Sequence, residues 1–126
     1  MLDTTVVGVQ LDRFDSIRKL TEIYGGSCLL KGSGSLMAHS SDPSAIELCS
    51  EGNPGMGSGG MGDLLAGLIA ALISQGIAPD KSLSCAVCVH GEAADLAAEN
   101  SGERGLVASD LLPWLRRLVN PSTMPD

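Results

Sequence analysis

The spacing of apolar residues near the start of the chain predicts a short amphipathic helix over residues 12–23. Phe14, Ile17 and Leu20 recur at intervals of three, which places them on one helical face. An aspartate at the start of this range can cap the helix, and Gly25 can end it. The pattern therefore favours one helix before the first strand.

Three further helices are predicted in the second half of the chain, after a glycine-rich loop. Pro79 and Asp80 favour the start of the middle helix, and Ser109 with Asp110 favours the start of the last. The apolar residues of these helices occupy more than one face, so other structure should cover them. We therefore expect the chain to pair with other copies or to form part of a larger α/β body. The predicted ranges are 63–74, 81–99 and 109–119.

Three short strands are predicted between the first helix and the glycine-rich loop. Turn-forming residues at 32–34 and 40–44 separate short apolar runs, a pattern typical of an antiparallel meander at the edge of a sheet. The run Val6-Val7-Gly8-Val9 offers one possible further strand. The three strands are expected over Ser27–Leu30, Ser35–His39 and residues 45–49.

Composition narrows the class of protein. With 126 residues, 44% of them apolar, the chain is expected to form one globular domain. Aromatic residues are scarce and the net charge is −7, so nucleic acid and anionic membrane surfaces are poor partners. No secretory signal is visible, and the longest apolar run, residues 64–73, is too short to span a bilayer. We expect a soluble cytoplasmic protein.

Four cysteines occur, and two of them, Cys85 and Cys88, form a C-x-x-C pair. A redox pair of this type belongs at a helix N-terminus, whereas this one falls in the middle of a predicted helix. A zinc site would need a second pair, which the sequence lacks. We therefore expect buried free thiols, and we expect the nearby His90 on a helix surface or in packing.

Six glycines fall within residues 52–62, and Asp63 follows them at once. Glycines allow positive φ and let a ligand approach the main chain closely. The unsatisfied N–H groups and the dipole of the helix that follows favour a bound phosphate. The loop therefore indicates a nucleotide or another phosphorylated ligand.

Two common phosphate motifs do not fit this loop. The Walker pattern requires a lysine after its last glycine, and none is present. The dinucleotide fingerprint G-x-G-x-x-G matches twice, but it needs an acidic residue at the end of a second strand about twenty residues on. Asp80 has that distance but lies at a predicted helix start. The Rossmann interpretation therefore lacks its structural context.

Phosphoryl transfer uses the whole unit of loop, helix start and carboxylate. Asp63 can accept a proton from a substrate hydroxyl beside a cradled phosphate. Taken alone, Asp63 can equally be a helix N-terminal carboxylate stabilised by the dipole. Lys31, at the end of a strand, can direct its ammonium at phosphate oxygens, or can simply be an exposed lysine. The hydroxyls of Ser33 and Ser35 can bind the same ligand or belong to an ordinary turn.

Three segments resemble one known family, the ADP- or ATP-dependent NAD(P)H-hydrate dehydratases of the ribokinase-like superfamily. Residues 53–67, Asn-Pro-Gly-Met-Gly-Ser-Gly-Gly-Met-Gly-Asp-Leu-Leu-Ala-Gly, are similar to the family's glycine-rich segment. Residues 31–35, Lys-Gly-Ser-Gly-Ser, resemble its upstream Lys-Gly segment, and residues 102–112 resemble its closing segment. The three motifs occur in the family's order and cover most of the chain from residue 27 onward.

The resemblance implies a repair reaction on hydrated NAD(P)H. A nucleotide, ADP or ATP, phosphorylates the hydroxyl of the hydrated nicotinamide ring, and loss of phosphate restores NAD(P)H. Asp63 matches the substrate-side aspartate, the expected catalytic base. Mg²⁺ is expected to screen the nucleotide phosphates, although no residue is an evident ligand for it. The residues expected to bind the nucleotide are Lys31, Gly32, Ser33, Gly34, Ser35, Gly59, Gly60 and Gly62.

The chain departs from the family in its length. The family domain is much longer, so residues 1–126 are expected to form the C-terminal part of a ribokinase-like α/β fold. That part comprises a short β-meander, a glycine-rich loop and three helices, and its partner is a missing N-terminal half or another copy of the chain. A sugar or vitamin kinase of the same superfamily and a non-catalytic oligomerising fragment remain alternatives.

Overall fold

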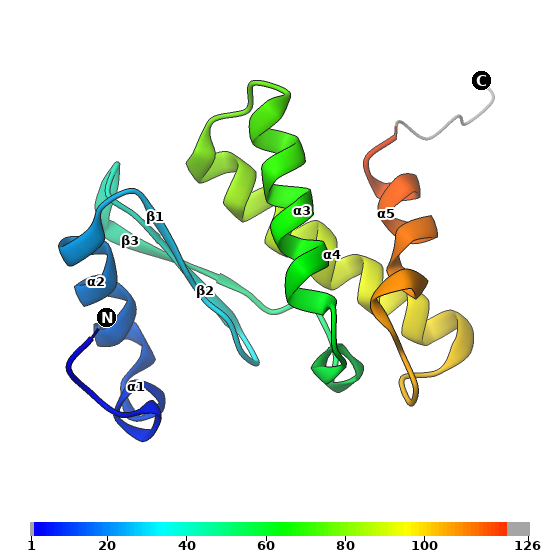
Figure 1. Cartoon of the computed structure of the whole chain (residues 1–126), viewed down its shortest axis with the longest axis horizontal. Coiled ribbons are helices and arrows are strands. Elements are labelled where there is room, and N and C mark those ends of the chain that lie inside the picture. Colours follow the sequence, from blue (N-terminus) through cyan, green and yellow to red (C-terminus); the bar gives the residue numbers. More distant parts are fainter. Residues whose placement is uncertain (1, 121–126) are drawn as a thin grey trace.

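The computed structural model describes residues 2–120, which form a small sheet with helices on both faces (Figure 1). Helix α2 packs against one face of the sheet, and α4 contacts all three strands from the other. Helix α3 packs on α4, and α5 packs further along α4. The sheet therefore separates a short N-terminal helical layer from a larger C-terminal one.

Helix α1, Val6–Leu11, stands where a further strand was possible, so that expectation was wrong. The Thr5 hydroxyl accepts a hydrogen bond from the N–H of Gly8 at 3.1 Å, which caps the first turn. No residue of α1 is buried. The valines of α1 therefore lack cross-strand packing, which is what gives β-branched residues their preference for strands.

Helix α2, Arg13–Tyr24, confirms the first predicted helix. The carboxylate of Asp12 accepts from the N–H of Asp15 at 2.9 Å, and Gly25 ends the helix with φ of 68°. Ile17 is fully buried against the sheet. A cap, a periodic apolar face and a stop signal agree here, which explains why the sequence predicted the helix.

The sheet is the predicted antiparallel meander, with strand order β1-β2-β3. Its strands are β1, Ser27–Leu30, β2, Ser35–His39, and β3, Asp42–Cys49. Strand β3 begins three residues before the predicted start and includes Pro43. A proline is tolerated because β3 is an edge strand, where a missing N–H removes no ladder bond on the open side.

Residues of the central strand alternate between two cores. Leu36 and Ala38 of β2 pack with Ile17 of α2. Met37 faces the other way and joins a cluster with Leu65 of α3 and further residues of α4. Successive side chains of β2 point to opposite faces of the sheet, and helices cover both faces. The N-terminal helix and the C-terminal helices therefore pack against the same strand.

The three C-terminal helices are α3, Met61–Ser74, α4, Pro79–Ser101, and α5, Leu112–Leu118. The first two agree with the predicted ranges to within about two residues. The last begins later than predicted, because a 3-10 turn, Ala108–Leu111, precedes it. The carboxylate of Asp110 accepts from the N–H of Val107 at 3.0 Å and so closes that turn.

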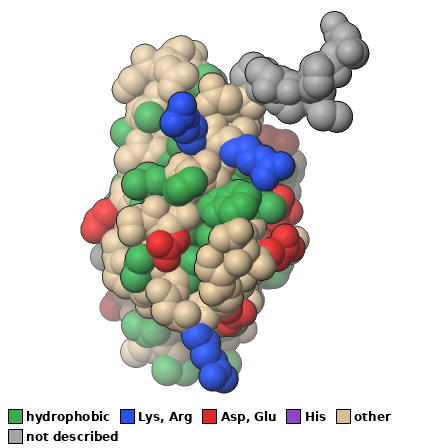
Figure 2. Space-filling view, turned by 90° about the vertical axis from the view of Figure 1, so that its right-hand side faces the viewer, with side chains coloured by type: hydrophobic (Ala, Val, Ile, Leu, Met, Phe, Trp, Pro, Cys, Tyr) green, Lys and Arg blue, Asp and Glu red, His purple; other side chains and the backbone are tan. Residues whose placement is uncertain are grey.

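Several apolar side chains of the helices are exposed, as the sequence indicated. Ile73 of α3 is 42% exposed and Leu112 of α5 is 53% exposed. Figure 2 shows the molecule from the α5 side, where hydrophobic side chains lie among basic and acidic ones. No helix among residues 2–120 is long and apolar enough to cross a membrane.

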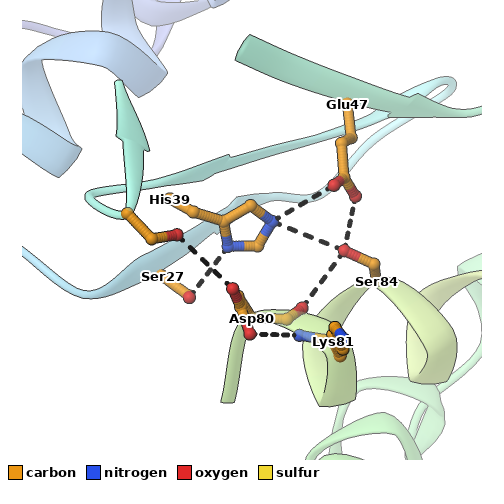
Figure 3. Close-up of polar contacts among 7 residues, drawn as sticks. Ser27, His39, Glu47, Asp80, Lys81 and Ser84 are labelled. Atoms are coloured by element: carbon orange, nitrogen blue, oxygen red, sulfur yellow. Dashed lines mark hydrogen bonds and ion pairs between the residues drawn. The ribbon is translucent and has the colours of Figure 1, made fainter. Parts of the chain in front are cut away.

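A polar cluster joins the sheet to the start of α4 (Figure 3). His39 is buried, and its Nδ1 lies 2.8 Å from the hydroxyl of Ser27, while its Nε2 lies 3.6 Å from the carboxylate of Glu47. Ser84 of α4 donates to Glu47 and lies 3.4 Å from His39 Nε2. These contacts fix the rotation of α4 about its axis relative to the sheet, so they also fix which α4 residues face the glycine-rich loop.

Candidate functional site

A cavity of about 590 Å³ lies where the β1–β2 turn, the glycine-rich loop, the start of α3 and the middle of α4 meet. Its volume falls in the range of small-molecule sites. Four separate segments of the chain contribute to it, so it exists only in the folded protein. Six of the residues predicted to bind nucleotide line it: Lys31, Gly32, Ser33, Gly34, Ser35 and Gly62.

Arg13 of α2 holds the β1–β2 turn in place. Its guanidinium donates to the carbonyl of Ser33 at 3.0 Å and to the carbonyl of Leu30 at 3.1 Å. A Cβ at Gly32 would lie 3.0 Å from the same guanidinium, and Gly32 has φ of 155°. Arg13 could not be identified from the sequence, because an arginine in the first turn of a helix carries no signal for a contact with a turn about twenty residues away.

Asp95 of α4 anchors the start of the glycine-rich loop. Its carboxylate accepts from the N–H of Gly52 at 2.8 Å and from the side-chain amide of Asn53 at 2.9 Å. The side-chain oxygen (Oδ1) of Asn53 accepts in turn from the N–H of Gly55 at 3.1 Å. A loop rich in glycine is entropically expensive to order, and these bonds to a long helix offset part of that cost.

The closing segment that resembled the dehydratases packs against the glycine-rich loop. A Cβ at Gly55 would lie 2.6 Å from the carbonyl oxygen of Glu103 and 3.1 Å from the Cβ of Leu106. Leu106 is buried in the cluster that also contains Met61 of α3. Close packing therefore requires glycine at position 55. The closing segment, residues 102–112, thus supports the conformation of the glycine-rich loop.

The first turn of α3 presents backbone donors that no described side chain caps. Gly60 occupies the N-cap position with φ of 86°, a left-handed conformation that favours glycine. The first helical bond runs from the N–H of Leu64 to the carbonyl of Gly60 at 2.9 Å. The N–H groups of Met61, Gly62 and Asp63 precede that bond, so they have no intrahelical acceptor. This helix end has the donor arrangement of an anion-binding terminus.

Lys31 lies directly against this helix end. A Cβ at Gly62 would lie only 2.8 Å from Nζ of Lys31. The ammonium therefore touches the backbone of the first turn of α3, at the positive end of the helix dipole. The sequence placed Lys31 and the loop in one site, and the structure brings them into contact.

Two buried polar atoms beside the cavity have no hydrogen-bond partner among the described residues. They are Oγ of Ser58 and Nε2 of His90, and both residues line the cavity. Buried polar groups are nearly always paired, so each unpaired one needs an explanation. Two such atoms on one cavity wall are consistent with partners supplied by a ligand or by water.

His90 is buried in packing, one of the two positions expected from the sequence. It is only 5% exposed and lines the cavity from α4. Burial lowers the pKa of His90 from its ordinary value of 6.5, and Lys31 lowers it further, while a backbone hydrogen bond to Met61 opposes the shift. The neutral imidazole is therefore favoured near pH 7. The sequence around His90 carries no signal for this position, because its burial depends on how α4 packs against the rest of the fold.

Three predicted site residues do not line the cavity: Gly59, Gly60 and Asp63. Gly60 shapes the helix start through its positive φ, whereas no described atom lies within 4 Å of a Cβ placed at Gly59. Asp63 is exposed in the first turn of α3, one residue after Gly62. Its carboxylate is therefore next to the helix end and open to solvent.

The cysteines are free thiols, but the expectation that they are buried was partly wrong. Cys49 is buried and Cys28 is half-buried, whereas Cys85 and Cys88 are exposed. The last two lie in the middle of α4, as predicted. They are exposed because α4 faces the sheet with other residues, among them Ala86 and Val87.

A second cavity, of about 400 Å³, lies between the end of α4 and α5. It is lined by Arg104 and Trp114 among others, and the guanidinium of Arg117 lies 5.9 Å from the centre of the Trp114 ring. None of the predicted site residues borders it. It is therefore separate from the candidate site.

Comparison with known families identifies the group to which this arrangement belongs. The family model described as NAD(P)H-hydrate dehydratase (Carb_kinase) matches residues 1–117 of the chain. The chain belongs to the NAD(P)H-hydrate dehydratase family. The family suggested by the three sequence motifs is thus confirmed.

Relatives of known function share this family but are longer. The chain is 48% identical over 120 residues to the bifunctional NAD(P)H-hydrate repair enzyme Nnr of Vibrio cholerae, covering 95% of the chain and 24% of that protein. It is 36% identical over 126 residues to the ADP-dependent (S)-NAD(P)H-hydrate dehydratase of Neisseria meningitidis, covering 97% of the chain and 42% of that protein. The chain thus spans less than half of either relative.

A solved dehydratase structure has the same fold over nearly the whole chain. The ADP/ATP-dependent NAD(P)H-hydrate dehydratase of Bacillus subtilis, crystallised with ATP and Mg²⁺ and soaked with CoA, matches with a TM-score of 0.85 and 25% identity. The match covers 94% of this chain and 43% of that one. The predicted fold class, part of the dehydratase α/β fold, is confirmed.

We expect His90 to titrate below pH 6.5 in the folded protein, because burial and Lys31 disfavour its charged form. The unfolded chain takes up this proton at the ordinary pKa, so the free energy of unfolding should decrease as pH falls below 6.5. Imidazole NMR signals of the two histidines give the midpoint directly, and urea unfolding at several pH values gives the free energy. His90→Gln should remove this part of the pH dependence. A His90 midpoint at or above 6.5 would contradict the prediction.

Proposed function

We propose that this chain is the nucleotide-binding part of an NAD(P)H-hydrate dehydratase and that it binds ADP or ATP in the candidate cavity. The phosphates would lie against both the Lys31 ammonium and the first turn of α3, on the side that faces the cavity. The observation that carries the proposal is the 2.8 Å separation between Nζ of Lys31 and the Cβ position of Gly62. Membership of the dehydratase family supports the choice of ligand.

Electrostatics favours a polyanion at this place. The ammonium of Lys31 and the positive end of the α3 dipole lie side by side and repel each other when no anion is present. A phosphate bound against both groups interacts favourably with each of them and accepts from the N–H groups that lack a helical partner. The chain carries a net charge of −7, so this local positive site contrasts with the negative charge of the chain as a whole.

The neighbouring turn can hold the rest of the nucleotide. Arg13 fixes its backbone through the carbonyl of Ser33, and the hydroxyl of Ser35 donates to the carbonyl of Gly32 at 3.3 Å. This bond uses the Ser35 proton, while its oxygen lone pairs stay available. We propose that Gly32, Ser33, Gly34 and Ser35 form one wall for the nucleotide, with Gly59 and Gly60 at the other side of the phosphates.

We propose Asp63 as the base for the substrate hydroxyl. It follows Gly62 directly and is exposed, so a substrate outside the cavity could reach both its carboxylate and a phosphate held at the helix end. The hydroxyl oxygen of the hydrated nicotinamide ring would attack the terminal phosphorus of ADP or ATP, and its proton would pass to Asp63. The bond from that phosphorus to the bridging oxygen would break, so AMP or ADP would leave. Loss of phosphate and of a ring proton then restores the double bond of NAD(P)H.

Mg²⁺ fits this scheme as a companion of the nucleotide. The Bacillus subtilis dehydratase was crystallised with ATP and Mg²⁺. Among residues 2–120, the grouped metal-ligand side chains are Cys49, Glu51 and Cys88, and thiols are poor ligands for Mg²⁺. Magnesium usually binds through one or two carboxylates together with substrate phosphates. The phosphates would therefore hold most of its coordination shell and offset their own charge.

We further propose that residues 1–126 form part of a larger catalytic unit. The chain covers 42% of the Neisseria meningitidis dehydratase, and exposed apolar residues such as Leu11 and Ile73 offer surfaces for more of the domain or for another copy. The cytoplasmic location expected from the sequence stays a prediction. The relatives are named as dehydratases and repair enzymes, so nothing favours a sugar or vitamin kinase over the dehydratase.

Lys31→Met should weaken ADP binding about 10-fold to 100-fold, because a charge-assisted hydrogen bond contributes about 1.5–3 kcal/mol. Isothermal titration calorimetry and the nucleotide-induced rise in Tm both measure the effect. Gly62→Ala should have a similar effect, since the new methyl group displaces the Lys31 ammonium.

Lys81→Met is the matched control, because Lys81 is exposed at the start of α4 and does not line the cavity. Its affinity for ADP should equal that of the unchanged chain. Equal affinity of all three variants, or no binding of ADP or ATP by the unchanged chain, would contradict the proposed nucleotide site.

Asp63→Asn should abolish recovery of NADH while leaving ADP binding within about twofold, because the carboxylate acts on the substrate hydroxyl and does not line the cavity. Hydrated NADH is incubated with the chain and ADP or ATP, and the return of reduced-nicotinamide absorbance is followed. If the unchanged chain binds nucleotide but recovers no NADH, catalysis requires the larger unit proposed above, and nucleotide binding stands. Recovery that persists in Asp63→Asn would exclude Asp63 as the base.

A further inference from the structure

Three side chains with metal-binding atoms converge beside the candidate cavity. They are Cys49 at the end of β3, Glu51 just after it, and Cys88 on α4. The two sulfur atoms and one carboxylate oxygen all lie within 4.8 Å of one another. Neither the nucleotide site nor the proposed chemistry uses any of these three groups.

Close packing of α4 on the end of β3 brings these groups together. A Cβ at Gly91 would lie 2.8 Å from both the Cβ and the carbonyl oxygen of Glu51. Glycine at this position therefore allows the helix to touch the chain after β3. Cys88 lies three residues before Gly91, on the same side of the helix, so the same contact places its sulfur next to Cys49.

A hydrogen bond links two members of the cluster. The thiol of Cys49 donates to the carboxylate of Glu51 at 3.0 Å. Burial and this hydrogen bond raise the pKa of Cys49 to about 12, and the same bond holds the pKa of Glu51 below its usual range. Cys49 is thus a neutral thiol beside an ionised carboxylate.

We propose that Cys49, Cys88 and Glu51 form a binding site for a divalent cation with affinity for thiolates, of the zinc class. Two thiolates and one carboxylate suit zinc and exclude magnesium and calcium, which prefer oxygen ligands. Binding releases one proton from each thiol, and the 2+ charge of the cation offsets most of the three negative charges that result. Zinc sites with three protein ligands keep a fourth position for water or substrate.

The position of the cluster has two consequences for cation binding. Cys49 and Glu51 line the cavity, and Cys88 is exposed, so the cation has a route of entry. Ligation would link the end of β3 to α4 just before Gly52, where the glycine-rich loop begins. The folded chain should therefore gain stability when the cation is present, because the unfolded chain lacks the assembled site.

The full-length, reduced chain is titrated with Cd²⁺ or Co²⁺, and ultraviolet or visible charge-transfer absorption of the metal–thiolate bond is followed. We expect saturation at one equivalent, release of two protons per cation and a rise in Tm. Cys49→Ser and Cys88→Ser should each lower the affinity at least tenfold, and Glu51→Gln should lower it less. Cys88 is exposed, so Cys88→Ser decides the question even if Cys49→Ser fails to fold.

Cys85→Ser and Cys28→Ser are the matched controls. Cys85 is exposed on the same helix one turn from Cys88, and Cys28 lies on β1. Both variants should bind the cation as the unchanged chain does. Equal loss in Cys85→Ser and Cys88→Ser would overturn the proposal, as would binding no tighter than to the urea-unfolded chain. A Cys49–Cys88 disulfide that persists under reducing conditions would also overturn it. Nucleotide binding is not used as a readout, so this test is independent of the proposed function.

Discussion

The contact between the ammonium of Lys31 and the first turn of α3 is the constraint on which the site depends. Two positive features are held together there: a lysine side chain and the N–H end of a helix. Their mutual repulsion has to be offset by the rest of the fold or removed by an anion. In the structure, the packed neighbours of Lys31 and α3 offset this repulsion. A bound phosphorylated ligand would remove it.

Each side of this contact is fixed by an element remote in sequence. Arg13 of α2 holds the turn that carries Lys31, and Asp95 of α4 holds the loop that leads into α3. The sheet lies between these two helices, so its two cores set their separation. A site assembled in this way needs little movement to accept a ligand, which lowers the entropy cost of binding.

Local signals explain what the sequence could predict. The cap at Asp12, the turn glycines and the glycine-rich run each act over a few residues, so the helix α2, the meander and the helix start at α3 could all be inferred. The contacts of Arg13 and the burial of His90 could not, because both depend on how distant elements pack. Helix α1 differs from the predicted strand for a related reason: valines favour strands, but no neighbouring strand pairs with these valines in the described structure.

An amide NMR titration of the chain with ADP and Mg²⁺ tests the nucleotide site at Lys31 and α3 most directly. We expect the largest chemical-shift changes in two separate segments, residues 31–35 and residues 60–63. Both sets of changes should diminish together when the Lys31 ammonium is removed. Changes centred on the second cavity near Trp114, or no changes at saturating nucleotide, would contradict the proposed site.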